Sequence, residues 1–329
     1  MHLGLDGILA SQHGIFARRQ AIACGVTPRE FARLTGGDGP WIKVRYGVYT
    51  TRERWSALAS HDRLVLRDRA ALLVCAPDAV LSHSSAARIL GLSLYAVPNQ
   101  LSHVTRTSAT QTTRVQAHVK HHVAALPVAH VMTLAGVRVT TPARTVVDLA
   151  REYGFYTGVV AADATLNTGA DPAVLLAMVE ALTTEPGGPE ITAAVTNARA
   201  GADTPIETLG RIVLTRLGID DLVLQHVIPF PEGGHAVGDI YSPTLNHLWE
   251  CDGRVKYQTH DAGSPPDISA DRVVWLEKKR EDRIRSLGIG ISRLLWTDVQ
   301  PHNFERTAQR LRREIQQQSG GGSWLPPAA

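Results

Sequence analysis

The sequence predicts a chain of several domains, in which two α+β blocks precede a mixed α/β block. Its length of 329 residues is more than one domain usually needs. Helical and strand patterns mix in the first part of the chain, and after residue 203 they follow the order helix, strand, strand, strand, helix, strand, helix. The predicted domains are 1–60, 61–152, 153–203 (an Ala-rich helical connector) and 204–317, followed by a disordered tail at 318–329.

Composition favours a cytoplasmic protein. The chain is 44% hydrophobic and 20% charged, which is ordinary for a globular protein. Its longest apolar run, at 70–76, is far shorter than the ~20 residues that span a bilayer, and the N-terminus lacks the basic-then-apolar pattern of a secretory signal. Cys24, Cys75 and Cys251 lie far apart, which fits reduced thiols better than disulfides or a zinc site. We therefore expect no membrane association.

Charge is distributed unevenly although the net charge is only +3. Basic residues outnumber acidic ones in 1–150 and in 272–313, whereas acidic residues dominate 151–271. Basic surfaces attract polyanions, and an acidic centre repels them unless it holds cations. Solvated helix faces are the alternative explanation.

The first predicted domain has the pattern of a winged helix-turn-helix. Two short helical patterns precede a third at 27–36, where Thr27 is placed as the N-cap and Pro28 opens the helix. The segment 41–51 then alternates as a β-ribbon. Such an arrangement puts a helix in the DNA major groove with a ribbon beside it, although many such units only bind proteins. The candidate DNA contacts are Arg29 and Arg33 on the helix and Lys43 and Arg45 on one face of the ribbon.

The second domain reads as helices and strands in mixed order. Helices are predicted at 61–76, 82–92 and 141–152, the last with Thr141 as N-cap, and strands at 100–108, 114–123 and 136–141. His118, His121 and His122 raise the question of a metal site. No carboxylate or cysteine lies close in sequence, and neighbouring residues of a strand face opposite sides, so a surface strand is the preferred interpretation.

Three segments, "WIKVRYGVYT", "LSHSSAARILGL" and "GVRVTTPARTVVDLA", resemble the N-terminal region of AbiEi-like antitoxins. These are winged-helix proteins of the abortive-infection (type IV) toxin–antitoxin class. The resemblance covers about the first 150 residues, and Thr-Pro-x-Arg-Thr-x-x-Asp-Leu is its most specific element. It implies DNA binding by the winged helix, usually as a repressor of its own operon, and a cognate toxin protein as partner.

A predicted hairpin in the last domain, "VGDIYSPTLNHLWECDGRVKY", carries an unusual number of carboxylates. If Tyr241 pairs with Leu248, Asp239 lies directly opposite Glu250, with Cβ atoms about 5 Å apart. Asp252 adds a third carboxylate about 7 Å along the strand. Like charges at this separation destabilise a hairpin unless a cation binds between them. The hairpin therefore predicts a site for Mg²⁺ or Mn²⁺.

Each acid also has a plain structural explanation. Glu207 follows Thr204 at the spacing of a capping box, and Asp252 precedes a glycine and could open a turn. Asp239 could pair with an arginine. Glu250 is the hardest to explain in this way, because it lies between Trp and Cys in an otherwise apolar strand.

The spacing of these acids resembles the PD-(D/E)xK nuclease core, and five segments between 204 and 300 resemble Vsr-like endonuclease domains in the same order: "TPIETLGR", "VGDIYSP", "LWECDGRVKY", "LEKKREDRIRSLG" and "SRLLWTD". The resemblance implies a restriction-endonuclease-like αβββαβ core. It also implies Asp239 and Glu250 as metal ligands and Glu207 as the helix acid that joins them. Asp252 stands where the motif has a lysine, so Lys256 would have to supply the ammonium group. The resemblance also implies a histidine near this point, but His247 precedes Glu250 rather than following it.

Two functions follow from these observations. The first is a DNA-binding protein with a metal-dependent endonuclease domain, in which the metal activates water and Lys256 stabilises charge on the phosphate. The second is a non-catalytic repressor or antitoxin with a degenerate nuclease fold. RNA as the substrate ranks last, because no aromatic stacking platform is present.

A basic helix would hold the DNA backbone in the nuclease model, through Lys278, Lys279, Arg280, Arg283 and Arg285. Its acidic residues Glu277, Glu281 and Asp282 could instead pair with these side chains and make it a solvated face.

Overall fold

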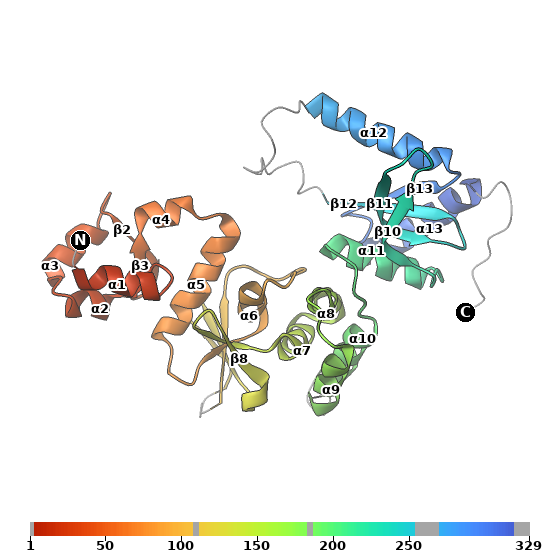
Figure 1. Cartoon of the computed structure of the whole chain (residues 1–329). Helices are drawn as coiled ribbons and strands as arrows, with labels where there is room; N and C mark the ends of the chain where they lie inside the picture. The colour runs from red at the N-terminus through yellow and green to blue at the C-terminus, as the bar shows by residue number, and fades with distance from the viewer. Residues whose placement is uncertain (1–2, 108–111, 183–186, 254–269, 319–329) are drawn as a thin grey trace. The chain divides into compact units, whose positions relative to one another are not determined.

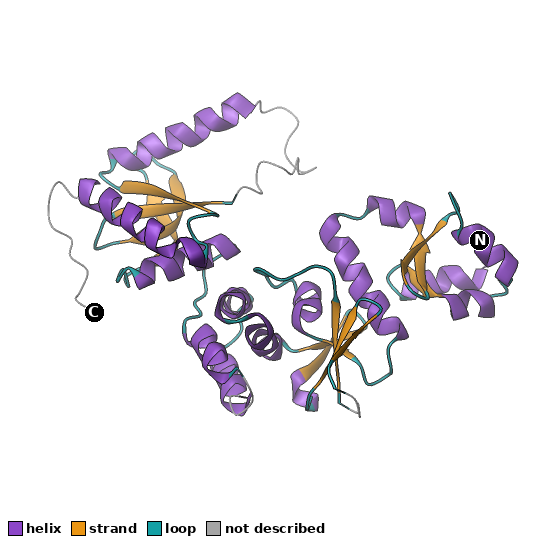
Figure 2. Ribbon diagram, turned by 180° about the vertical axis from the view of Figure 1, so that it is seen from behind, coloured by secondary structure: helices purple, strands orange, loops and turns teal. Residues whose placement is uncertain are grey.

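A computed structural model describes residues 3–107, 112–182, 187–253 and 270–318. The chain forms two compact units (Figures 1 and 2). Unit one comprises Met1–Thr165 with Ala170–Asn197, and unit two comprises Leu166–Gly169 with Ala198–Ala329. The architecture is mixed α/β with a three-stranded, a six-stranded and a four-stranded sheet. Within the described residues, none of the helices is both long and apolar enough to cross a membrane. The tail predicted to be disordered lies, from 319 onward, outside the described residues.

Unit one begins with three helices and a small antiparallel sheet of order β1-β3-β2. Thr27 caps α3 as predicted, because its hydroxyl accepts the N–H of Glu30 at 3.2 Å. Phe16, Phe31 and Trp41 are buried together in the core between these elements. The elements are α1 (Leu3–Ser11), β1 (Ile15–Ala17), α2 (Arg18–Ala23), α3 (Pro28–Thr35), β2 (Trp41–Arg45), β3 (Val48–Thr51), α4 (Arg52–Ala57) and α5 (Ser60–Val74).

A six-stranded sheet of order β6-β7-β5-β4-β9-β8 forms the rest of this unit together with helices. The pairs β5–β7 and β4–β9 are parallel, and the other pairs are antiparallel. Its strands are β4 (Val80–Leu81), β5 (Ser102–Arg106), β6 (Arg114–Gln116), β7 (Val119–Val123), β8 (Val131–Leu134) and β9 (Val137–Thr140). Its helices are α6 (His83–Leu90), η1 (Val128–His130), α7 (Pro142–Tyr153), α8 (Phe155–Asn167), α9 (Pro172–Leu182) and α10 (Gly188–Thr196).

The helices of this unit pack closely. Thr141 caps α7 as predicted, with its hydroxyl accepting the N–H of Arg144. The helices α9 and α10 pack against α7, so most of the segment predicted as a connector belongs to unit one, whereas 166–169 and 198–203 belong to unit two. At Gly158 of α8 an added Cβ would come within 2.8 Å of the methyl groups of Ala150 and Ala194. Only glycine therefore allows α8 to approach α7 and α10 this closely.

The prediction of a single strand at 114–123 is wrong in one respect, because this segment forms a hairpin of two strands. Strands β6 and β7 pair antiparallel around Ala117 and His118, whose φ angles are 48° and 60°. Two residues at positive φ build a tight hairpin turn, which normally carries Asn or Gly. Neither residue type is present at these two positions, so the turn could not be predicted from residue type.

Unit two has the element order that the sequence predicts. Its sheet has the order β10-β11-β12-β13, with β12 and β13 parallel and the other pairs antiparallel. Ile284 of α12 packs with Leu248 on one face, whereas α11 approaches Cys251 at Gly210 on the other. The elements are α11 (Pro205–Arg216), β10 (Val223–Pro229), β11 (His235–Ser242), β12 (His247–Asp252), α12 (Ala270–Ser286), β13 (Gly290–Leu295), η3 (Pro301–Asn303) and α13 (Phe304–Gln318).

Candidate functional site

A basic surface on unit one is formed by α3 and the ribbon. Arg29 and Arg33 are exposed on α3, and Lys43 is exposed on β2. Among the described residues, no carboxylate forms an ion pair with any of these three side chains. Arg18, at the start of α2, adds a further exposed guanidinium, which lies 5.4 Å from the centre of the Phe31 ring. These free cations can attract a polyanion.

Arg45 is placed differently from the other three candidate DNA contacts. A register shift between Lys43 and Arg45 interrupts the alternation of β2. Arg45 is half-buried and donates to the carbonyl of Ala117 at 3.3 Å. Burial lowers the pKa of its guanidinium, and the neighbouring Cys75 opposes this effect. Arg45 thus joins the ribbon to the β6–β7 turn.

The carboxylate of Glu207 is buried near the start of α11, with 5% of the residue exposed. Its Oε1 accepts the hydroxyl of Thr204 at 2.6 Å, and its Oε2 accepts the N–H of Asp203 and the side-chain amide of Gln225, each at 2.8 Å. Burial raises its pKa, and Asp239 adds to the rise. The Thr204 hydroxyl donates to Glu207 and caps no backbone N–H, so the arrangement differs from a capping box.

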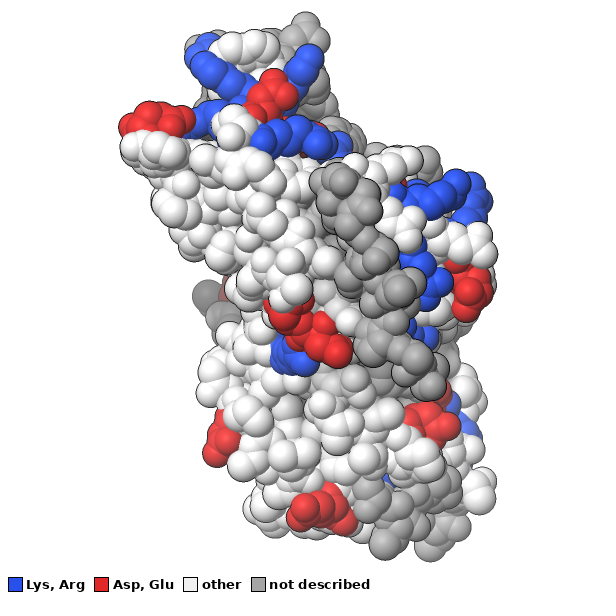
Figure 3. Space-filling model, turned by 90° about the vertical axis from the view of Figure 1, so that its right-hand side faces the viewer, with Lys and Arg blue, Asp and Glu red and all other residues white. Residues whose placement is uncertain are grey.

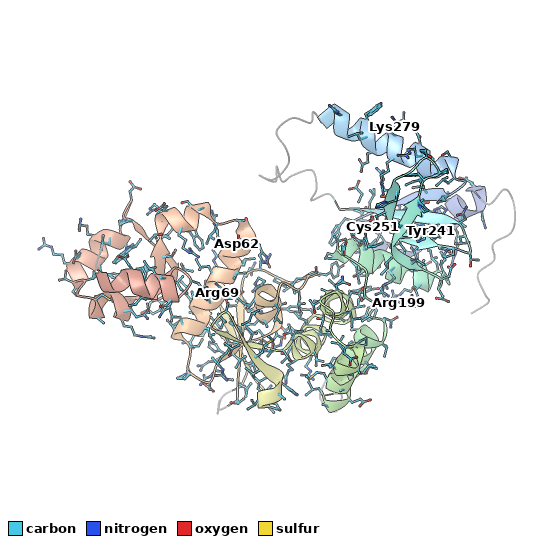
Figure 4. The ribbon with its side chains drawn as sticks, in the orientation of Figure 1. Asp62, Arg69, Arg199, Tyr241, Cys251 and Lys279 are labelled. Carbon is cyan, nitrogen blue, oxygen red and sulfur yellow. The ribbon has the colours of Figure 1, made fainter. Side chains whose placement is uncertain are left out.

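The predicted hairpin register is confirmed for Tyr241, which pairs with Leu248. Figure 4 labels Tyr241 and Cys251, which lie on the neighbouring strands β11 and β12. The ladder ends at Ile240 opposite Trp249, one pair before Asp239 and Glu250. There the Asp239 carboxylate turns to the backbone and accepts the N–H of Cys251 at 2.6 Å.

Glu250 is bound by an arginine of α12. Arg280 donates from its two terminal nitrogens to the two carboxylate oxygens, and also to the carbonyl of Val237. Burial raises the pKa of Glu250, Asp239 raises it further, and Arg280 opposes the rise. Asp252, half-buried at the end of β12, pairs in register with Leu295 of β13.

The fit of Mg²⁺ or Mn²⁺ to these acids can be judged from their present partners. Asp239 acts electrostatically on both Glu207 and Glu250, so the three acids lie in one region of the unit. Both oxygens of Glu207 and of Glu250 and one oxygen of Asp239 accept hydrogen bonds from protein donors, and among the described residues the three acids do not form a group of close ligand atoms. A divalent cation at this site would have to displace Arg280 from Glu250. Lys256 lies outside the described residues.

The basic side chains of α12 fall into two sets. Lys278 and Lys279 are exposed, and the ammonium of Lys279 lies 4.8 Å from the ring centre of Trp275. Arg283 instead pairs with Glu232 at 2.7 Å and lies over the ring of Phe230. Figure 3 shows blue basic atoms with red acidic atoms among them at the top of the view, where α12 lies in Figure 1. The helix therefore presents a surface of mixed charge.

Three buried histidines form a group that the sequence analysis missed. His83 begins α6, His103 lies on β5 and His122 lies on β7. One ring nitrogen of each lies within 4.8 Å of the others. The parallel pairing of β5 and β7 puts His103 and His122 near each other, which sequence spacing alone did not indicate. Of the three histidines weighed from the sequence, only His122 belongs to this group, and His118 is exposed.

Comparison with known families gives one match. Residues 73–186 match the family model of the AbiEi antitoxin C-terminal domain. This segment contains the six-stranded sheet and the three buried histidines, and it includes neither α1–α3 nor the part of unit two from Ala198 onward. No curated protein matches the chain. The resemblance to AbiEi antitoxins is thus supported over this segment, whereas the resemblance of unit two to endonucleases gains no support.

Proposed function

We propose that this chain is a DNA-binding regulator of the antitoxin class. The AbiEi match of residues 73–186 supports a place in a toxin–antitoxin system, with a cognate toxin protein as partner. The observation that carries DNA binding is the pair of arginines on α3, which are exposed like Lys43 on β2 and have no ion pair with a carboxylate of the described residues. A regulator of this kind works in the cytoplasm on its own operator.

The first part of unit one acts as a winged helix in this proposal. α3 enters the major groove, and its Arg29 and Arg33 contact base edges or phosphates. Lys43 on the ribbon β2–β3 contacts the adjacent sugar–phosphate backbone. Arg45 supports the ribbon from behind through its hydrogen bond to Ala117 and does not contact DNA.

The test is a mobility-shift titration on the DNA upstream of the chain's own gene. Arg29→Ala/Arg33→Ala is expected to weaken binding by about 30-fold or more, equivalent to about 2 kcal/mol. The matched control is Arg306→Ala/Arg313→Ala, which removes the same charge from exposed positions of α13. No shift by the parent protein, or equal losses in both double variants, would contradict the proposal.

A second candidate function is metal-dependent DNA cleavage by unit two, with Mg²⁺ or Mn²⁺ as cofactor and a restriction-endonuclease-like fold. The αβββαβ element order and the electrostatic coupling of Glu207 and Glu250 to Asp239 favour it. It requires Arg280 to release Glu250. Lys278 and Lys279 would then be the exposed cations of α12 available to DNA.

Cleavage is tested by incubating the full chain and DNA with either metal. Metal-dependent products that disappear in Asp239→Ala and in Glu250→Ala would support this second function. The regulator proposal expects no cleavage, or cleavage that is equal in the parent and in both variants because a contaminant causes it.

A further inference from the structure

The three buried histidines of unit one are arranged unlike an ordinary packed cluster. The exposed fractions of His83, His103 and His122 are 6, 1 and 8%. His103 Nδ1 lies 3.0 Å from His122 Nε2, and the rings of His83 and His122 stack with centroids 3.7 Å apart. Polar ring nitrogens therefore point toward one another inside the protein, where each needs a partner.

The backbone holds these side chains in place from three elements. In the parallel pairing of β5 and β7, His122 lies beside Thr105, two residues beyond His103, so both imidazoles project from the same face of the sheet. His83 has a φ of 50°, a left-handed conformation that a residue with a side chain adopts at a cost. Strain of this kind concentrates at functional sites.

The outer nitrogens of two imidazoles have oxygen partners. The hydroxyl of Tyr153 lies 3.2 Å from His103 Nε2, and the hydroxyl of Ser82 lies 2.9 Å from His83 Nδ1. Ser82 is itself held by a hydrogen bond from Thr105 at 2.8 Å. Histidines that bind metals usually donate their other ring N–H to an oxygen, which fixes the ring and the tautomer.

Three cations lie near the cluster, and each has a carboxylate partner. Lys120, Arg88 and Arg144 are the charged groups that act on the histidines. Each is paired with a carboxylate, in the ion pairs Lys120–Glu152, Arg88–Asp68 and Arg144–Asp148. The carboxylates offset part of the repulsion that these cations exert on a bound metal ion.

The imidazoles are neutral at physiological pH, as metal ligands must be. The pKa of His103 is lowered to about 4 and the pKa of His122 to about 3, and the pKa of His83 lies well below its ordinary value. Burial is the main cause of these shifts, and the neighbouring cations and histidines lower the pKa values further.

We propose that His83, His103 and His122 bind one transition-metal ion of the zinc class. Imidazole nitrogens about 2.0–2.1 Å from a tetrahedral Zn²⁺ are roughly 3.4 Å apart. The nitrogens here are separated by distances from 3.0 Å up to 4.8 Å, and the stacked rings of His83 and His122 must tilt apart so that their nitrogens point at one ion. His83 and His103 keep their outer oxygen partners, and a fourth position stays open for water or another donor. This inference is independent of the DNA-binding proposal.

The experiment uses the full chain, stripped with a chelator and then equilibrated with Zn²⁺. Metal content after desalting and competition with a chromophoric chelator give the stoichiometry and affinity. The expected result is one Zn²⁺ per chain. His122→Ala is expected to weaken binding at least 100-fold, whereas the matched control His118→Ala, at an exposed position of the neighbouring turn, is expected to leave it unchanged.

Thermal unfolding of the parent protein with and without Zn²⁺ keeps the test decisive if the His122 variant does not fold. The proposal expects the melting temperature to rise with Zn²⁺ concentration, because an ion that binds the folded state stabilises it. A parent protein that retains no Zn²⁺ and shows no rise overturns the proposal. So does a folded His122→Ala that binds Zn²⁺ as tightly as His118→Ala.

Discussion

Arg280 on α12 donates two hydrogen bonds to the carboxylate of Glu250 on β12, at 3.0 and 3.3 Å. The carboxylate that the sequence marks as the strongest metal ligand is therefore half of an internal ion pair. Planar guanidinium groups match carboxylates in this forked geometry better than an ammonium can. The pair ties α12 to the sheet at the point where the nuclease model needs a free acid.

Arg280→Ala is predicted to destabilise unit two by about 1 kcal/mol. Glu250 would lose its forked partner in a half-buried site, and the cost is limited because both side chains are partly exposed. Urea unfolding followed by circular dichroism measures the change. The control is Arg285→Ala, which breaks an exposed pair with Glu281 on the same helix and is expected to cost about 0.3–0.5 kcal/mol. Equal losses of unfolding free energy in the two variants would mean that the Arg280–Glu250 pair stabilises the unit no more than the exposed Arg285–Glu281 pair.

Glu207→Ala is predicted to cost about 1–3 kcal/mol, because three donors lose their acceptor in a buried position. Glu207→Gln keeps one acceptor oxygen and should lose less. Both variants are compared with the parent by urea unfolding. A glutamine variant that is as unstable as the alanine variant would show that the negative charge, rather than the number of acceptors, holds the start of α11.

The buried pair Asp68–Arg88 predicts strong non-additivity in unit one. Both side chains are almost fully buried, and the guanidinium of Arg88 donates hydrogen bonds to both carboxylate oxygens of Asp68, at 2.7 and 3.2 Å. Arg88→Met leaves the carboxylate unpaired and is expected to cost about 3–5 kcal/mol. The double variant Asp68→Leu/Arg88→Met should be more stable than Arg88→Met alone. If the costs of the single variants simply add in unfolding measurements, the pair does not act as a unit.

The buried histidines predict an acid-sensitive unit one in chelator-treated protein. The folded-state pKa values of His103 and His122, about 4 and about 3, lie below the ordinary value of 6.5. The unfolded chain therefore takes up protons first, and stability is lost as pH falls below about 6.5. The slope can reach about 1.4 kcal/mol per pH unit for each histidine that titrates only on unfolding.

This pH dependence is measured by urea unfolding between pH 7 and pH 5, above the range in which most carboxylates titrate. His103→Gln/His122→Gln should flatten it. His118→Ala, which alters an exposed histidine, should leave the slope as in the parent protein. A parent protein of constant stability over this range would be inconsistent with histidines that stay neutral.

DNA binding is predicted to weaken steeply with salt, because phosphate contacts release counterions. Lys43→Ala should lower the magnitude of the slope of log K against log salt by about 1, with a similar loss on every DNA sequence. Arg45→Ala should leave that slope unchanged, since Arg45 is bound to Ala117. A change of slope in Arg45→Ala but not in Lys43→Ala would mean that Arg45, rather than Lys43, contacts the phosphates.

Local features of the fold were predictable from the sequence because they depend on neighbours along the chain. Thr27 and Thr141 each cap a helix that begins with proline, as their spacing predicts. The hairpin register between Tyr241 and Leu248 follows from the apolar alternation of two short strands. The order of elements in unit two was predictable for the same reason.

Features that depend on contacts between distant segments were not predictable. The β6–β7 turn uses Ala117 and His118 at positive φ, which tertiary packing imposes against their preference. The carboxylates of the hairpin suggested a cation, but the partner of Glu250 is Arg280, thirty residues further along the chain, and Asp239 accepts a backbone N–H. Sequence spacing could not show this, because the segment between them has no pattern that fixes where α12 lies.

The sequence by itself determined the capped starts of α3 and α7, the order of elements along unit two and the register of Tyr241 with Leu248, because side-chain periodicity and capping act within a few residues. Only the tertiary structure decided which polar groups meet. It paired Glu250 with an arginine, turned Arg45 toward Ala117, and brought His83, His103 and His122 together from three elements. Buried polar groups must find partners wherever the fold puts them, and the fold, rather than the spacing of the residues, sets those distances.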